Sequence, residues 1–210
     1  EAMRRLGIAP EKISLIYFGV DTRKFSSGEK SEELRTKLEI HDSPAVISLR
    51  NLDPLYYIDS LIRAMPLVLR EITGSQFVIA GRGSEEMRLK KLAKSLDVWE
   101  NTKFVGLIPN DELPEYLTSI DVYVSTALSD AGLSASTAEA MACGLPVIVT
   151  DVADNRKWVE DGVNGFVVPI KDPKSLAERI IYLLRNDDIR RKLGKISRKI
   201  IVERNDYYKE

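Results

Sequence analysis

The chain has 210 residues, of which 44% are hydrophobic and 30% are charged, and its formal net charge is −1. This composition is typical of a soluble α/β domain, and the near-zero charge gives no support to binding of nucleic acid or of an anionic membrane surface. No apolar run approaches the ~20 residues that a transmembrane helix needs, and the sequence shows no signal-peptide pattern, so we expect a cytoplasmic protein.

Strand-like and helix-like segments alternate along the chain. Short apolar segments predict strands at Ala45–Leu49, Gln76–Ala80, Lys103–Val105, Asp121–Ser125, Val147–Thr150 and Phe166–Val168. Apolar residues at helical spacing predict helices over 58–69, Met87–Leu96, Glu112–Ser119, Leu133–Cys143, Asn155–Glu160, 176–184 and Asp188–Glu203. Pro66 should kink or split the first of these helices. The alternation predicts a Rossmann-like, doubly wound parallel sheet of about six strands with right-handed crossovers.

The run from Leu128 to Thr150 is the most informative part of the chain. It begins with a loop of small residues and continues into a helix that ends at Gly144, before Pro146 opens an apolar strand. A small-residue loop that leads into a helix N-terminus lets an anion approach unpaired backbone N–H groups. Glu139, on the first turns of this helix, would then bind sugar hydroxyls beside the anion. A diphosphate joined to a ribose fits this arrangement.

Sheet topology supports the same location. In a doubly wound sheet of strand order 3-2-1-4-5-6, ligands bind beyond the carboxyl ends of strands 1 and 4, where the order reverses. The strand at 45–49 delivers Arg50 to this edge, and the strand at 121–125 delivers the small-residue loop. We therefore expect Arg50 to face the loop across a crevice.

The segment Glu139-Ala-Met-Ala-Cys-Gly-Leu-Pro-Val-Ile148 resembles, residue for residue, half of the donor-site motif of the glycosyltransferase family that includes glycogen and sucrose synthases. Further similarity lies in Ile13–Phe25, in Val105–Gly106 and in Asp161–Phe166, so the resemblance extends from about residue 13 to about residue 192. It implies one half of a GT-B fold, with all of 1–210 forming a single nucleotide-sugar-binding domain. An N-terminal acceptor domain would be missing from this chain, and 193–210 would belong to a terminal helix.

The resemblance implies that the protein is a retaining glycosyltransferase that uses a UDP-, GDP- or ADP-sugar and needs no metal or other cofactor. The family's first motif glutamate falls on Ala131, so its neighbour Asp130 is our candidate catalytic residue. Donor contacts are implied for Arg50, Asn51, Arg82, Leu107, Gly132, Leu133, Ser134, Ala135 and Glu139. The acceptor stays unidentified, and the missing domain would allow contact with the inner membrane face.

The phosphate-binding cations of the family are displaced in this sequence. The family's arginine position falls on Asn51, with Arg50 one residue early, and its lysine position falls on Tyr56. Because charge-assisted hydrogen bonds to phosphate are each worth ~1.5–3 kcal/mol, another cation must compensate or donor handling must differ. Arg50, Arg82 and Lys157 are the candidates.

Each site residue also has an ordinary structural interpretation. Ser136 and Glu139 have the spacing of a capping box, in which Glu139 only bonds its own helix start. The glycines around Arg82 are equally consistent with a plain turn, and Leu107 with an exposed turn residue. At the level of function, the main alternative is a non-catalytic nucleotide-sugar-binding or regulatory module with a degenerate phosphate clamp. A nicotinamide-dependent oxidoreductase is disfavoured because no glycine fingerprint follows Leu49.

The single cysteine and the single histidine exclude two further kinds of chemistry. With one cysteine, Cys143, the chain forms no intrachain disulfide, which suits a reducing compartment. We expect Cys143 to be a small, buried apolar residue. With one histidine, His41, and only scattered acids, the sequence argues against a bound transition metal, and we expect His41 at the surface.

Overall fold

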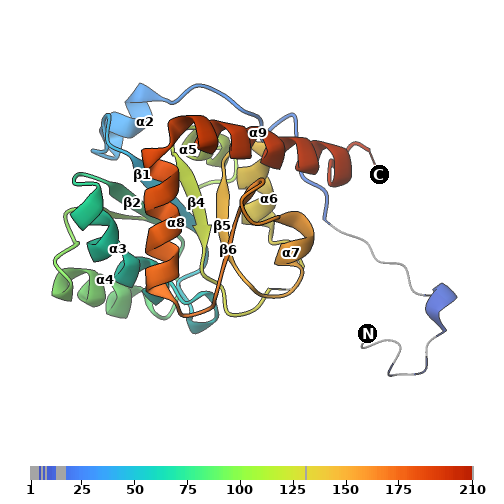
Figure 1. Ribbon diagram of the computed structural model, residues 1–210, viewed down its shortest axis with the longest axis horizontal. Helices are drawn as coiled ribbons and strands as arrows, with labels where there is room; N and C mark the ends of the chain where they lie inside the picture. Colours follow the sequence, from blue (N-terminus) through green and yellow to red (C-terminus); the bar gives the residue numbers. More distant parts are fainter. Residues whose placement is uncertain (1–4, 6, 8, 13–17, 131, 210) are drawn as a thin grey trace.

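The computed structural model describes residues 5, 7, 9–12, 18–130 and 132–209. A single parallel sheet of six strands in the order β3-β2-β1-β4-β5-β6 forms the centre of the molecule (Figure 1). The strands are β1 (Ala45–Leu49), β2 (Gln76–Ala80), β3 (Thr102–Gly106), β4 (Val122–Ser125), β5 (Val147–Thr150) and β6 (Gly165–Val168). Both the Rossmann-like fold and the expected strand order are confirmed.

Helices cover both faces of the sheet. The helices of the described residues are, in chain order, η1 (Pro10–Lys12), α2 (Glu32–Lys37), η2 (Pro54–Tyr56), α3 (Asp59–Glu71), α4 (Glu86–Ser95), α5 (Leu113–Thr118), α6 (Ala135–Ala142), α7 (Asn155–Trp158), α8 (Pro173–Arg185) and α9 (Asp187–Arg204), and of these η1 lies apart from the sheet (Figure 1). Residues of α3, α4 and α8 share one apolar core on one face, and residues of α5, α6 and α7 share a second core on the other. Strands β1, β2, β4, β5 and β6 are mostly apolar and mostly buried, as expected for a parallel sheet covered on both faces, whereas the edge strand β3 is only partly buried.

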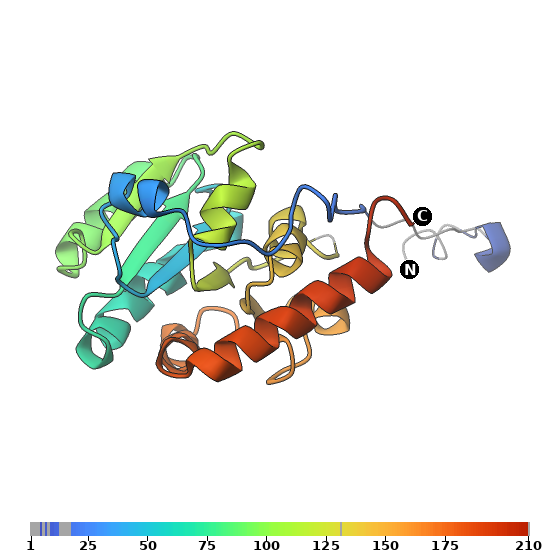
Figure 2. The ribbon, with the colours of Figure 1, turned by 90° about the horizontal axis from the view of Figure 1, so that it is seen from above.

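Helix α9 packs against both apolar cores, with Leu193 in one and Ile201 in the other. It follows α8 and runs across to α6 (Figure 2), where Gly194 packs directly on the backbone of Gly144. From the same helix, Arg198 donates hydrogen bonds to the carbonyl oxygens of Ala142 and, at 3.0 Å, Phe25. This packing holds the C-terminal end of α6 in place. The N-terminal end of the same helix forms part of the candidate site.

The structure differs from the sequence-based picture at three places. Helix α3 continues through Pro66 without a break, because its buried apolar residues pack against the core over the whole helix. Helix α2 was not expected; Ser31 caps it, since its side chain accepts a hydrogen bond from the Leu34 N–H at 3.2 Å. The terminal helix ends at Arg204 and does not continue to 210, because the chain turns and Asp206 pairs with Val20.

Other expectations are confirmed or fall outside the described residues. Cys143 is buried, which raises the pKa of its thiol to about 12, and His41 is exposed. The start of the family-like segment at 13–25 lies outside the described residues, as does Ala131. Within the described part of the chain, no helix is long and apolar enough to cross a membrane.

Candidate functional site

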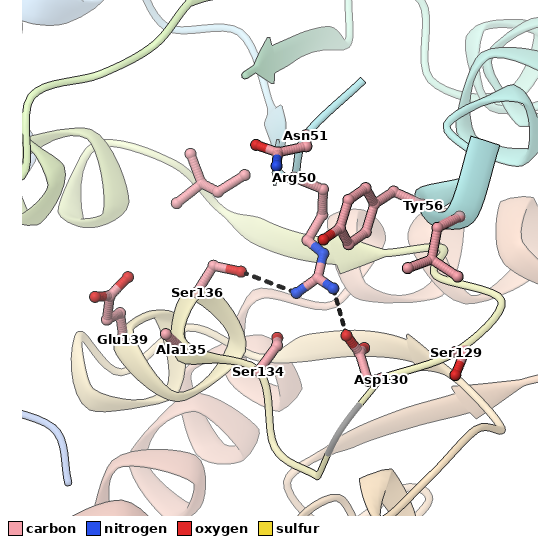
Figure 3. A pocket seen from close by; sticks show the side chains of 11 residues that line it. Arg50, Asn51, Tyr56, Ser129, Asp130, Ser134, Ala135, Ser136 and Glu139 are labelled. Atoms are coloured by element: carbon pink, nitrogen blue, oxygen red, sulfur yellow. Dashed lines mark hydrogen bonds and ion pairs between the residues drawn. The ribbon is translucent and has the colours of Figure 1, made fainter. Parts of the chain in front are cut away.

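A cleft of about 640 Å³ lies at the carboxyl edge of the sheet, between the ends of β1 and β4 (Figure 3). It is lined by Leu49, Arg50, Asn51, Leu55, Tyr56, Ser129, Asp130, Ser134, Ala135, Ser136 and Glu139. The strand order reverses at this place, as the sequence predicted. A smaller recess of about 160 Å³ adjoins the cleft and adds the more apolar wall formed by Ala80, Gly81, Leu107, Ile108 and Leu113.

The N-terminus of α6 opens into the cleft. Ser134 is the N-cap residue, and its side chain accepts a hydrogen bond from the Thr137 N–H at 3.3 Å. The capping box that would place Ser136 at the N-cap is therefore wrong, and Glu139 is not needed to bond its own helix start. Because helix starts leave backbone N–H groups without intrahelical partners, the N–H groups of Ala135 and Ser136 are available to an anion in the cleft.

Glu139 stands where the cleft and the recess meet and contributes to both walls. Partial burial raises the pKa of its carboxyl group, and the positive charge of Lys24 opposes this shift. Among the described residues, no side chain or backbone group donates a hydrogen bond to this carboxylate. A partly desolvated carboxylate that accepts no hydrogen bond from the described residues is well placed to accept hydrogen bonds from the hydroxyl groups of a ligand.

Arg50 crosses the cleft from the end of β1. Its side chain is only 8% exposed, and it donates hydrogen bonds to the carboxylate of Asp130 and, at 3.5 Å, to the hydroxyl of Ser136 (Figure 3). The guanidinium carbon lies 4.5 Å from the ring centre of Tyr56. The Nε atom is buried and has no hydrogen-bond partner among the described residues. Arg50 thus faces the small-residue loop across the crevice, as predicted, but it is paired with an acid of that loop.

The other candidate cations lie away from the cleft. Arg82 is exposed, and its guanidinium lies near Gly106 instead of lining the cleft. Lys157 forms an ion pair with Asp154 at 2.8 Å on α7. Of the three cations that the sequence offered, Arg50 alone lines the cleft.

Of the remaining sequence candidates, Asn51 and Leu107 line a cavity, whereas Gly132 and Leu133 line neither the cleft nor the recess. Asn51 is exposed and lines both the cleft and the recess, whereas Leu107, which is 64% exposed, lines the recess alone. Gly132 has a φ of +95° and precedes the partly buried Leu133 just before α6 begins. No group of three or more His, Cys, Asp or Glu side chains suited to a metal occurs among the described residues.

Sequence reasoning missed a chain of hydroxyl groups beneath the start of α6. The Tyr123 hydroxyl, from buried strand β4, lies 2.9 Å from the Ser136 hydroxyl and accepts a hydrogen bond from Thr137 at 3.3 Å. The Ser134 and Thr137 hydroxyls are 2.7 Å apart. A tyrosine inside an otherwise apolar strand is a signal for such a network, because a buried phenol needs a hydrogen-bond partner.

The family model described as "Glycosyl transferases group 1" matches residues 30–200. The chain belongs to this family. It is 35% identical over 182 residues to a GDP-mannose-dependent monoacylated alpha-(1-6)-phosphatidylinositol monomannoside mannosyltransferase of Corynebacterium glutamicum, a match that covers 82% of this chain and 47% of that protein. The chain thus spans about half the length of this relative.

Solved structures of GT-B glycosyltransferases share the fold. HepE of Anabaena, crystallised with UDP-glucose, has a TM-score of 0.87 at 23% identity, and the match covers 98% of this chain and 57% of that one. The C-terminal domain of the group 1 glycosyl transferase LpcC from Francisella tularensis has a TM-score of 0.81 at 19% identity, with coverage of 90% and 100%. The fold therefore corresponds to one half of a GT-B enzyme.

Glu139 gives the first test of the site. Its raised pKa means that this group contributes stability that is fully present below its ordinary pKa of 4.5 and is lost as pH rises through the folded-state pKa. We therefore expect Glu139→Gln to raise the melting temperature at neutral pH, with the gain disappearing as the solution is acidified. The same change should weaken nucleoside binding about tenfold, or roughly 1.4 kcal/mol, because a carboxylate acceptor is lost.

Melting curves across pH and calorimetric titrations measure the two effects. Glu178→Gln, on the exposed side of α8, is the matched control and should change neither quantity. A lower melting temperature with unchanged affinity would instead show that Glu139 has a purely structural role.

Proposed function

We propose that this chain is the donor-binding half of a metal-independent, retaining glycosyltransferase that transfers a sugar from a nucleotide-sugar to an acceptor. The observation that carries the proposal is that buried Arg50 and partly buried Glu139 line the same cleft at the start of α6, and that the Glu139 carboxylate accepts no hydrogen bond from the described residues. Retention of stereochemistry and independence from metal rest on the family resemblance.

The cleft offers a separate position for each part of the donor. The diphosphate would lie between Arg50 and the N–H groups at the start of α6, and the ribose would place its hydroxyls at Glu139. The base would enter the recess beside Leu107. Positive charge and helix N–H groups at the diphosphate would stabilise the charge that grows on the leaving nucleoside diphosphate during transfer.

The relatives support a nucleotide-sugar and leave the base open. HepE binds UDP-glucose in its crystal, and the Corynebacterium enzyme depends on GDP-mannose. The side chains that line the recess are mainly apolar. Its uncharged polar side chains are those of Asn51 and Ser136. We therefore propose a UDP-, GDP- or ADP-sugar as the donor.

A second candidate function is favoured by a specific observation. The lysine position of the family is Tyr56, whose ring lies beside Arg50, and Arg50 itself is paired with Asp130. A cleft with so little free positive charge also suits a non-catalytic nucleotide-sugar-binding or regulatory module. Binding experiments do not separate the two candidates, whereas transfer experiments do.

We expect the isolated chain to bind one nucleoside diphosphate and its sugar but to transfer no sugar, because the chain supplies one wall of a cleft that lies between two domains in GT-B enzymes. Calorimetric titration with UDP-, GDP- and ADP-sugars tests binding. A transfer assay with the same donors compares this chain with a protein that also contains the other half found in its relatives. Turnover by the isolated 210 residues would overturn the half-enzyme proposal. Binding without turnover by the longer protein would favour the regulatory module.

A further inference from the structure

The ion pair between Arg50 and Asp130 differs from two other arginine–aspartate pairs of this protein. Arg156 meets Asp151 with two nitrogens, Nε and Nη2, each 2.7 Å from a different carboxylate oxygen. Arg88 likewise engages both oxygens of Asp59. Arg50 uses only Nη2 and meets a single oxygen of Asp130. The ion pair in the cleft is therefore monodentate, although the side chain of Arg50 is only 8% exposed and that of Asp130 only 9%.

The unused edge of Arg50 is suited to another anion. Nε and Nη2 point to the same side of a guanidinium group, and Nε is buried without a partner among the described residues. A buried N–H donor without an acceptor is unfavourable, and phosphate oxygens match the two N–H groups of this edge as a fork. A phosphate that replaced Asp130 would satisfy both nitrogens, whereas Asp130 satisfies one.

The other neighbours of Arg50 would not have to leave. Ser136 is neutral and reaches Nη1, on the far side of the guanidinium, while Tyr56 lies against its flat face. Asp130 is the acidic partner of Arg50 within the described part of the chain. The backbone N–H and carbonyl groups of Asp130 make no hydrogen bond to other described residues, so its side chain is released without breaking backbone structure.

We propose that Asp130 is an internal competitor for the donor's diphosphate: it occupies Arg50 when the cleft is empty and must be displaced for the donor to bind. This inference rests on the proposed function. Its consequence is a lower affinity for the diphosphate than Arg50 would otherwise give. The second consequence is faster release of the nucleoside diphosphate after transfer, because Asp130 forms its ion pair with Arg50 again.

The test compares wild type with Asp130→Asn, which keeps the size of the side chain and removes its charge. Titrations with UDP, GDP, ADP and inorganic pyrophosphate should show about tenfold tighter binding by the variant, equivalent to about 1.4 kcal/mol. The gain should appear mainly as slower dissociation in stopped-flow measurements. Binding of the corresponding nucleoside, which has no phosphates, should not change. A general effect on folding would change the affinity for the nucleoside as well.

The control removes one carboxylate from an ion pair elsewhere. Glu39→Gln breaks the 2.8 Å pair with Lys103 near the exposed edge of the sheet, far in the strand order from β4, and should leave all affinities unchanged. Equal or weaker diphosphate binding by Asp130→Asn, with wild-type binding intact, would overturn the competitor role alone. Absence of nucleotide binding by wild type and variant together would overturn the proposed function as well.

Discussion

Replacing Arg50 with alanine is expected to abolish measurable binding of nucleoside diphosphates while nucleoside binding stays nearly unchanged. Among the described residues that line the cleft, Arg50 is the only arginine or lysine, and its Nε has no hydrogen-bond partner there. Loss of two charge-assisted hydrogen bonds, each worth ~1.5–3 kcal/mol, lowers affinity by more than about 100-fold. Calorimetric titration with a nucleoside and its diphosphate measures the two affinities separately.

This variant needs a control for the charge that it leaves behind. Without Arg50, the side chain of Asp130 is a buried carboxylate with no cation, which destabilises a protein by several kcal/mol. The double variant Arg50→Ala/Asp130→Asn removes both charges, so it should fold better than the single variant and still fail to bind the diphosphate. Arg82→Ala should keep wild-type affinity. If Arg50→Ala binds the diphosphate as tightly as wild type, Arg82 and Lys157 become the candidates for phosphate contact.

The sequence predicted the sheet well because five of the six strands are short apolar runs that are mostly buried. The bounds of β1, β2 and β5 agree with those expected, and the strand order follows from general rules for parallel sheets. Local signals were weaker where tertiary packing decides. Pro66 disfavours a helix on its own, yet α3 is held together by apolar contacts from residues distant in the chain. Sequence alone does not reveal those contacts.

The sequence predicted the location of the candidate site but not the hydrogen bonds and ion pairs within it. The sequence brought Arg50 and the loop before α6 to the same edge, and both line the cleft. Which acid faces Arg50 depends on how a loop without regular structure folds, and spacing does not encode it. The choice of Ser134 over Ser136 as the N-cap has the same origin, because Ser136 is engaged by Arg50 and Tyr123. The roles of these residues toward a ligand stay predictions.

Replacing Gly81 with alanine is expected to lower folding stability strongly through its effect on the backbone near the site. A Cβ atom at Gly81 would lie 2.2 Å from the carbonyl oxygen of Arg50, and the φ of +129° is strained for any other residue. Since a backbone atom cannot move aside cheaply, the segment after β2 would have to shift away from the end of β1. Overpacking of this kind typically costs ~1–3 kcal/mol, and the strained φ adds about 1–2 kcal/mol.

Gly106→Ala separates the two causes. Its φ of +72° is also in the left-handed region, but an added Cβ would meet only the flexible end of Arg82, at 3.7 Å. We therefore expect Gly106→Ala to lose only the conformational part, about 1–2 kcal/mol, and Gly81→Ala to lose clearly more in the free energy of unfolding measured with urea. Gly81→Ala should also weaken diphosphate binding, because Arg50 is carried by the backbone that must move. Equal losses for the two variants would show that close approach of these backbones is not the reason for glycine at position 81.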